Sequence, residues 1–212
     1  MQQLGPDHHD TLRAANDLAR AYHDTQDPER ARALDKDTLQ RRRRLHGDDH
    51  PDTLASATNL ANRLRALGRH EEALALSEET LAGWRRVLGE DHPATLSTAS
   101  NLASDLAAVG RVRDAVVLGE ETLAGWRRVQ GVDHPDTLLT ANNLAVYLRD
   151  VGWVGEARVL GEETLERRRR VLAHAGLVPH QPQVYEAGAC GGAQWLLRCS
   201  RGLTPCNDRL AA

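Results

Sequence analysis

The sequence predicts an all-α fold, a right-handed superhelical solenoid of four helix–turn–helix repeats. Three observations predict it: a segment that returns at a constant step, apolar residues at helical spacing within each copy, and glycines at the same place in successive copies. Because one short helical hairpin cannot bury its own apolar face, such copies must stack on one another.

The repeat is marked by a segment that begins with Asp-His and ends with Thr-Leu. It starts at Asp7, Asp49, Asp91 and Asp133, which are separated by a constant 42 residues. A step without insertions indicates stacked units. We expect residues 1–174 to hold four repeats, at about 5–46, 47–88, 89–130 and 131–174, followed by an irregular tail over 175–212.

Each copy is predicted to contain two helices. In the second copy, Leu54, Leu60 and Leu64 belong to an apolar set at three- and four-residue spacing, typical of one helix face. Gly68 is expected to end the first helix, because glycine tolerates the positive φ that follows many helices. The His-Pro step between copies disfavours helix at the histidine, so Asp52 or Thr53 is predicted to cap the next helix. Trp84 and Trp126 continue the apolar stripe of the second helices, which favours a core role.

These motifs resemble a known family. The fourth copy carries Asp-His-Pro-Asp-Thr-Leu over 133–138, Asn-Asn-Leu-Ala over 142–145, and Gly152 followed by Glu156-Ala157. The pattern resembles the 42-residue tetratricopeptide repeat of the kinesin light chain type, and the resemblance covers roughly residues 4–174. It implies peptide or protein binding on a concave surface. In that family, asparagines at this motif position contact bound peptide, which carries over to Asn59, Asn101 and Asn143.

These three asparagines form the predicted binding ladder. An asparagine offers both a donor and an acceptor to the backbone of an extended peptide. Asp17 stands in the same column of the first copy and departs from the pattern. The neighbouring columns vary and are expected to read peptide side chains, which completes the predicted peptide-binding set: Asn59, Asn101, Asn143, Asn62, Arg63, Asp105 and Tyr147.

Two other interpretations of the ladder stay open. Each asparagine could simply bond a neighbouring helix, or the column could agree because the repeats were copied recently: residues 80–87 and 122–129 are both Thr-Leu-Ala-Gly-Trp-Arg-Arg-Val. The variable wall also fits an idle surface.

The predicted function is therefore a protein–protein interaction scaffold that binds a peptide or partner segment in its concave groove. The alternative is a regulatory or structural repeat fragment of a larger signalling protein or enzyme, because residues 3–8 match the segment between copies as though a repeat had preceded them. Self-association through the end repeats is a third interpretation. For the tail, a capping helix around Trp195, disorder and an aberrant reading frame all stay open.

The remaining patterns argue against other functions. Net charge is −3 and no apolar run approaches the 18 or so residues that span a bilayer, so nucleic acid is an unlikely partner, no membrane is expected, and a cytoplasmic location is predicted. The chain has no nucleophile elbow or phosphate loop, and its paired glutamates lie on exposed helix faces; we expect neither an enzyme nor a cofactor. The repeated histidines are too far apart to share a metal ion. Loose cysteine spacing in the tail, at Cys190, Cys199 and Cys206, likewise predicts no metal site.

Overall fold

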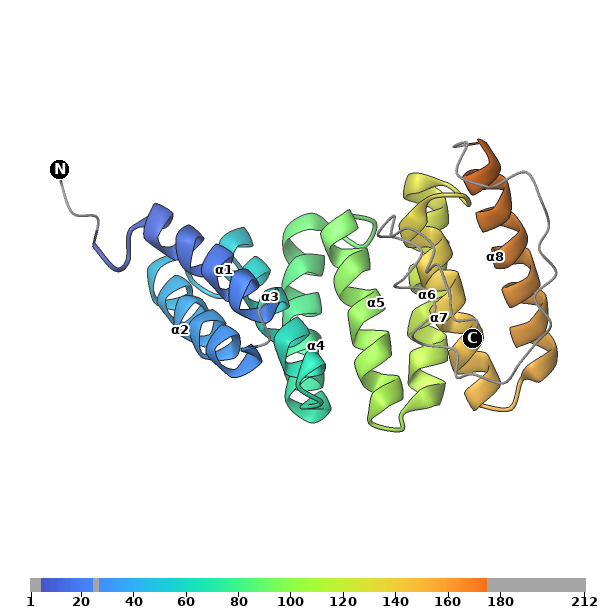
Figure 1. Ribbon diagram of the computed structural model, residues 1–212, viewed down its shortest axis with the longest axis horizontal. Helices are drawn as coiled ribbons and strands as arrows, with labels where there is room; N and C mark the ends of the chain where they lie inside the picture. Colours follow the sequence, from blue (N-terminus) through green and yellow to red (C-terminus); the bar gives the residue numbers. More distant parts are fainter. Residues whose placement is uncertain (1–4, 25–26, 175–212) are drawn as a thin grey trace, which may run out of the picture. The chain divides into compact units, whose positions relative to one another are not determined.

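The computed structural model describes residues 5–24 and 27–174, which form eight α-helices (Figure 1). Each helix packs on the next one along the chain, so the helices form four sequential pairs. The helices are α1 (His9–Asp24), α2 (Pro28–His46), α3 (Pro51–Ala66), α4 (His70–Leu88), α5 (Pro93–Ala108), α6 (Val112–Gln130), α7 (Pro135–Asp150) and α8 (Val154–His174). The all-α repeat array predicted from the sequence is confirmed. The tail over 175–212, for which a capping helix is one of three interpretations, lies outside the described residues together with its cysteines.

The repeated histidines begin the first helix of the pairs. His50 is the N-cap of α3, and its Nδ1 accepts a hydrogen bond from the Asp52 backbone N–H at 3.2 Å. His92 and His134 cap α5 and α7 in the same way, at 3.1 and 3.2 Å. The prediction that Asp52 or Thr53 caps the helix is therefore wrong. Proline at the first helical position has no N–H. The first free N–H of the helix therefore belongs to the residue after the proline, and it lies within reach of the imidazole of the histidine that precedes the proline.

Glycines end the helices, as predicted. Gly68 follows α3 with φ 72° and Gly89 follows α4 with φ 82°, a region that residues with a Cβ rarely adopt. The first pair begins its second helix with a side-chain cap, because the Asp27 carboxylate accepts a hydrogen bond from the Arg30 backbone N–H at 3.3 Å.

The core is built from small aliphatic side chains and two tryptophans. Leucines from successive pairs, Leu81, Leu102, Leu123 and Leu144 among them, pack in one continuous cluster. Trp84 and Trp126 are 7% and 3% exposed, and each indole N–H lies 3.4 Å from a hydroxyl on the first helix of its own pair. Their predicted core role is confirmed.

The first helices of successive pairs also touch one another. α3 contacts α5, and α5 contacts α7, in addition to the contacts between sequential helices. These contacts bring the predicted asparagine ladder onto neighbouring helices. Among the described helices, none is long and apolar enough to cross a membrane.

Candidate functional site: the face of the first helices

The ladder asparagines lie on three helices that touch in turn. Asn59 on α3 is exposed, whereas Asn101 on α5 and Asn143 on α7 are half-buried. We call the surface around these three residues the ladder face. In the first pair, Asp17 is exposed and pairs with Arg20 at 2.6 Å, so α1 does not continue the asparagine pattern.

The middle of the ladder is held by hydrogen bonds. The Asn101 amide donates to Asn62 Oδ1 at 3.2 Å, and Arg65 Nη1 donates to the same oxygen at 3.0 Å. The interpretation that a ladder asparagine bonds a neighbouring helix therefore holds for Asn101. This bond uses one amide N–H and leaves the Asn101 carbonyl oxygen and a second N–H. For Asn59 and Asn143, the part of the chain that the structure describes offers the side chain no hydrogen-bond partner.

Arg65 connects the ladder face to a buried carboxylate. Its guanidinium forms a two-pronged ion pair with Asp105, at 2.6 and 2.9 Å, and the Ser77 hydroxyl adds a third bond at 3.0 Å. The Asp105 side chain is 0% exposed and that of Arg65 is 23% exposed. Hydrogen bonds thus run from Asn101 through Asn62 and Arg65 to the interior, which fixes the geometry of the middle of the ladder face.

Hydroxyl groups connect α5 and α7, the first helices of the third and fourth pairs. Ser104 on α5 lies 2.9 Å from the Tyr147 hydroxyl on α7, and Ser100 lies 3.2 Å from the Thr140 hydroxyl. The α5–α7 contact is therefore partly polar.

Two of the predicted wall residues, Asp105 and Tyr147, are buried, and Arg63 in the same column is half-buried. Arg63, Asp105 and Tyr147 were expected to face a peptide, but their column faces the second helix of the preceding pair. We call that interface a seam: the first seam joins α2 and α3, the second α4 and α5, the third α6 and α7. Asp105 and Tyr147 are 0% and 7% exposed. For Asp105 and Tyr147 the expectation of an exposed wall is wrong, because these side chains lie between two helices.

Each seam is filled by a different pair of side chains. In the first, Arg63 Nε pairs with Asp35 at 3.2 Å, and in the second, Asp105 receives Ser77 and Arg65. In the third, the Tyr147 ring packs beside Gly119, where an added Cβ would lie 3.7 Å from the ring. Burial raises the pKa of Tyr147, although the Ser104 hydrogen bond partly opposes that rise.

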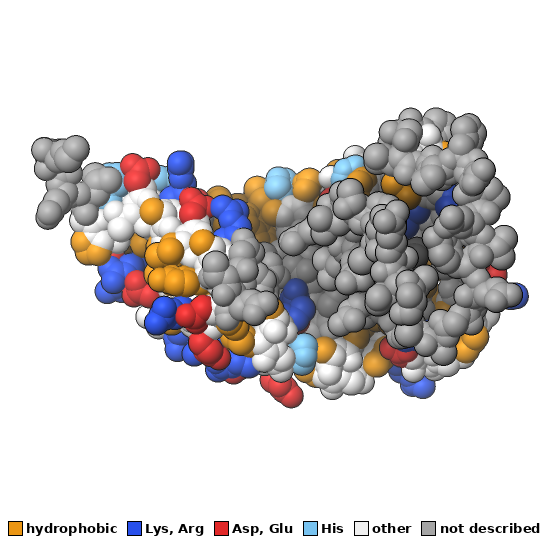
Figure 2. Space-filling model, viewed as in Figure 1, with side chains coloured by type: hydrophobic (Ala, Val, Ile, Leu, Met, Phe, Trp, Pro, Cys, Tyr) orange, Lys and Arg blue, Asp and Glu red, His pale blue; other side chains and the backbone are white. Residues whose placement is uncertain are grey.

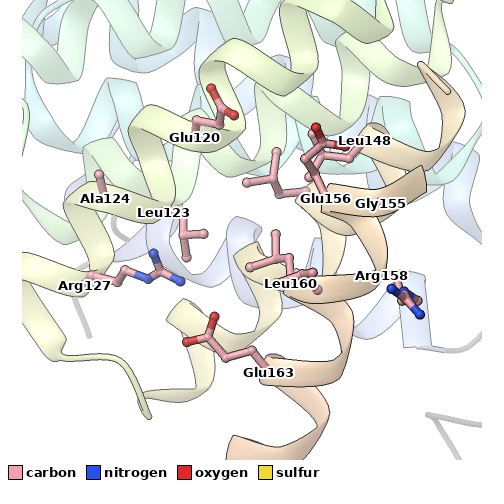
Figure 3. A pocket seen from close by; sticks show the side chains of 12 residues that line it. Glu120, Leu123, Ala124, Arg127, Leu148, Gly155, Glu156, Arg158, Leu160 and Glu163 are labelled. Atoms are coloured by element: carbon pink, nitrogen blue, oxygen red, sulfur yellow. The ribbon is translucent and has the colours of Figure 1, made fainter. Parts of the chain in front are cut away.

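The structure also contains a cleft that none of the ladder asparagines lines. A cleft of about 690 Å³ opens between α6, α7 and α8. Figure 3 shows Leu123 and Leu160 in the cleft, with Arg127 and Glu163 toward one end. Its apolar floor and charged rim could receive an apolar side chain of a partner.

Sequence reasoning missed this cleft, although a signal was present. Leu74 and Val116 occupy one column in the second and third pairs, and Val116 is 2% exposed. In the fourth pair this column holds the exposed Arg158, and Gly155 replaces Arg113 nearby. Arg158 therefore lines the cleft at a position where the second and third pairs carry an apolar residue.

Charge on the rest of the surface is mixed. Figure 2 shows acidic and basic side chains interspersed over α1 and α2, on the face that it presents. Within the described stretches, no three His, Cys, Asp or Glu residues gather as they would around a metal ion. The repeated histidines there have the capping role described above.

The comparisons with known proteins agree with this architecture. The tetratricopeptide repeat family matches residues 22–83, 55–125 and 97–170, which together cover more than half of the chain. The protein belongs to the tetratricopeptide repeat family. No curated protein matches the sequence.

Solved structures define the likeness more narrowly, as kinesin light chain-like. A variant of a Podospora anserina kinesin light chain protein with nearly identical TPR-like repeats has 28% identity and a TM-score of 0.72, with 81% of each chain covered. A second structure of the Podospora protein gives 28% identity and a TM-score of 0.69 over 80% of each chain. BtubC (BKLC) from P. vanneervenii has 19% identity and a TM-score of 0.71, covering 91% of this chain and 74% of its own, and shows the fold alone.

Proposed function

We propose that this chain is a protein-interaction scaffold, and that its ladder face binds an extended peptide or partner segment in a concave groove. Tetratricopeptide repeats are generally protein-interaction modules. One observation carries the finer proposal: Asn101 is held in place by Asn62 while keeping an amide donor and acceptor, and Asn59 and Asn143 flank it on the touching helices. A cytoplasmic location, predicted from the sequence, belongs to this proposal.

The peptide backbone is the natural partner of such a ladder. Amides along one face can bond successive peptide groups whatever their side chains, and a pre-positioned amide loses less entropy on binding. The exposed Asn62 and Val146 lie in the next column of the ladder face and would meet the peptide side chains. Because the ladder face offers few aromatic anchors, we expect affinities of roughly micromolar strength.

Peptide selection tests the ladder. Twelve-residue peptides selected from a random phage library on the purified full chain serve as probes, and fluorescence anisotropy gives their Kd. Replacing Asn101 and Asn143 together with alanine removes two backbone-binding amides, so we expect Kd to rise roughly tenfold. Circular dichroism should show unchanged helicity, since the Asn101 contact is a surface one.

Matched variants keep the test specific. Gln40→Ala with Glu162→Ala removes two exposed polar side chains from second helices and should leave Kd unchanged. Val159→Arg fills the cleft between α6, α7 and α8. Peptides whose Kd is unchanged by the asparagine substitutions, but which no longer bind the Val159→Arg variant, would show that the binding site is that cleft and not the ladder face.

Self-association is a second candidate function, favoured by a specific observation. Leu18 near the start of the array and Leu165 near its end are 47% and 50% exposed, although both belong to leucine columns that are buried in the other pairs.

A further inference from the structure

The two ends of the array expose opposite halves of one interface. Leu165 on α8 shares its column with Leu39, Leu81 and Leu123, which are 3%, 3% and 4% exposed. Leu18 on α1 shares its column with three leucines that are 4% to 7% exposed, namely Leu60, Leu102 and Leu144. At each end, one leucine is exposed because the described residues supply no further helix pair.

The internal seams show what covers these leucines elsewhere. Leu39 of α2 and Leu60 of α3 belong to one hydrophobic cluster at the first seam, and the leucines of the second and third seams, at 81, 102, 123 and 144, belong to another. α8 therefore presents the surface that α2, α4 and α6 present to the following helix. α1 presents the surface that α3, α5 and α7 present to the preceding one.

We propose that a second copy of this chain covers each end, with α8 of one copy packed against α1 of the next in the geometry of an internal seam. The contact joins two different surfaces, so it is head-to-tail and does not close on itself. Assembly therefore continues from copy to copy. This pairing specifies the second candidate function and is independent of peptide binding on the ladder face.

The residues that would fill the new seam are compatible. The seam columns pair Asp35 with Arg63 and Gly119 with Tyr147 inside the chain. Between copies, the same columns place Gly161 opposite Ala21, two small residues that bury no charge. A Cβ at Gly161 would meet nothing within 4 Å in the isolated chain, so there is room at this position for an approaching helix.

Charged residues near the seam would both favour and oppose the association of two copies. Arg43 of α2 and Glu79 of α4 form an ion pair of 2.7 Å between successive pairs, and the same two columns bring Arg169 to Asp37 of the next copy. The columns of the exposed Glu78–Arg111 pair instead bring Glu162 to Asp27, which are like charges. Exposed pairs of either sign have small effects, so the leucine contact decides the association.

Two single variants and their mixture test the pairing on the full chain. Light scattering of the wild type should give a mass that rises steadily with concentration, without a plateau at the dimer. Leu18→Arg blocks the α1 face and Leu165→Arg blocks the α8 face; each should weaken self-association at least tenfold, because a charge replaces a buried leucine. A one-to-one mixture of the two variants should form a heterodimer, since each variant keeps the face that the other has lost.

Other outcomes would overturn the pairing. A wild-type chain that stays monomeric at every concentration removes self-association altogether. A dimer that survives one single variant and is lost in the other indicates a symmetric contact of like ends. Val117→Arg, at a 57% exposed position on α6, is the control and should associate as the wild type does. Circular dichroism checks that all variants fold, which we expect because Leu18 and Leu165 are half exposed.

Discussion

The second and third seams occupy equivalent places in the array and are filled by opposite chemistry. In the second, the fully buried carboxylate of Asp105 is bonded by Arg65 and Ser77. In the third, Tyr147 places an aromatic ring beside Gly119, and only its hydroxyl reaches a polar partner, Ser104. One backbone interface thus accepts either an ion pair or an aromatic ring, provided that the facing residue changes with it.

This difference gives each pair a preferred neighbour. Were the fourth pair to dock in the place of the third, Tyr147 would meet Ser77 and leave Arg65 without its carboxylate. Were the third pair to dock in the place of the fourth, Asp105 would be buried against Gly119 without a cation. A buried charge without a partner is costly, so the seam residues favour the order found along the chain.

The largest expected effect comes from removing the cation of the second seam. Arg65→Ala leaves the Asp105 carboxylate fully buried with only the Ser77 hydroxyl, so we expect the free energy of unfolding to fall by about 3 kcal/mol. Urea unfolding followed by circular dichroism measures it. Arg149, in the same column of the fourth pair, forms an exposed ion pair with Asp150 at 2.8 Å.

Two variants check the cause of that loss. Arg149→Ala should change the stability by less than about 0.5 kcal/mol. Arg65→Met combined with Asp105→Leu removes both charges at similar volume and should recover most of the stability. An Arg65→Ala chain as stable as the wild type would mean that water reaches Asp105, and the contrast between the two seams would lose its energetic basis.

The sequence predicted the array well because its signals are periodic. The 42-residue step, the leucine columns and the terminal glycines each recur, and stacking requires them in every copy. The seam residues could not be assigned in this way. A column containing Arg63, Asp105 and Tyr147 suggests a variable exposed wall when it is considered alone, and only the packing shows that Asp105 and Tyr147 are buried.

A signal for the seams was nevertheless present in a second column. Asp35, Ser77 and Gly119 become smaller and less charged along the chain, and each suits the residue that it faces across its seam. When the two columns are compared, the matched residues indicate that the columns face each other across the seams. Each column considered separately indicates only variability. The ladder asparagines were found from the family resemblance, but the Asn62–Arg65 link that holds Asn101 depends on side-chain geometry.

The third seam should respond to high pH in a way that the second does not. Because burial raises the pKa of Tyr147 above its unfolded value of about 10, the native state holds this proton more tightly. Stability from Tyr147 is therefore complete below pH 10 and is lost as pH rises through the raised folded pKa. Urea unfolding at pH 8 and pH 11 should show a larger loss for the wild type than for Tyr147→Phe.

The phenylalanine variant separates this ionisation from the rest of the chain. It keeps the ring and the other tyrosines, but loses the hydrogen bond to Ser104, so at pH 8 it should be about 1 kcal/mol less stable than the wild type. Equal losses in the two proteins between pH 8 and pH 11 would show that water reaches the Tyr147 hydroxyl in the native state.

The smallest expected effect is the difference in stability between alanine variants at Gly119, in the third seam, and at Gly161, in the same column of α8. Gly161→Ala adds a methyl group that meets nothing within 4 Å, so the helix should gain about 0.5–1 kcal/mol from alanine. At Gly119 the same methyl group would lie 3.2 Å from Leu144 Cδ1 and 3.7 Å from the Tyr147 ring. That crowding should offset the helical gain and leave the stability nearly unchanged.

The second seam explains why this comparison is informative. Ser77 occupies the same column and carries a Cβ, so the backbone spacing of a seam admits one when the facing residue is Asp105. The requirement for glycine at 119 should therefore come from Tyr147 and the leucine beside it, and not from the repeat itself. Urea midpoints measured for both alanine variants give the difference directly. If Gly119→Ala stabilised the chain as much as Gly161→Ala, the third seam would have spare room, and the pairing of small residue with large ring would not be what distinguishes it from the second.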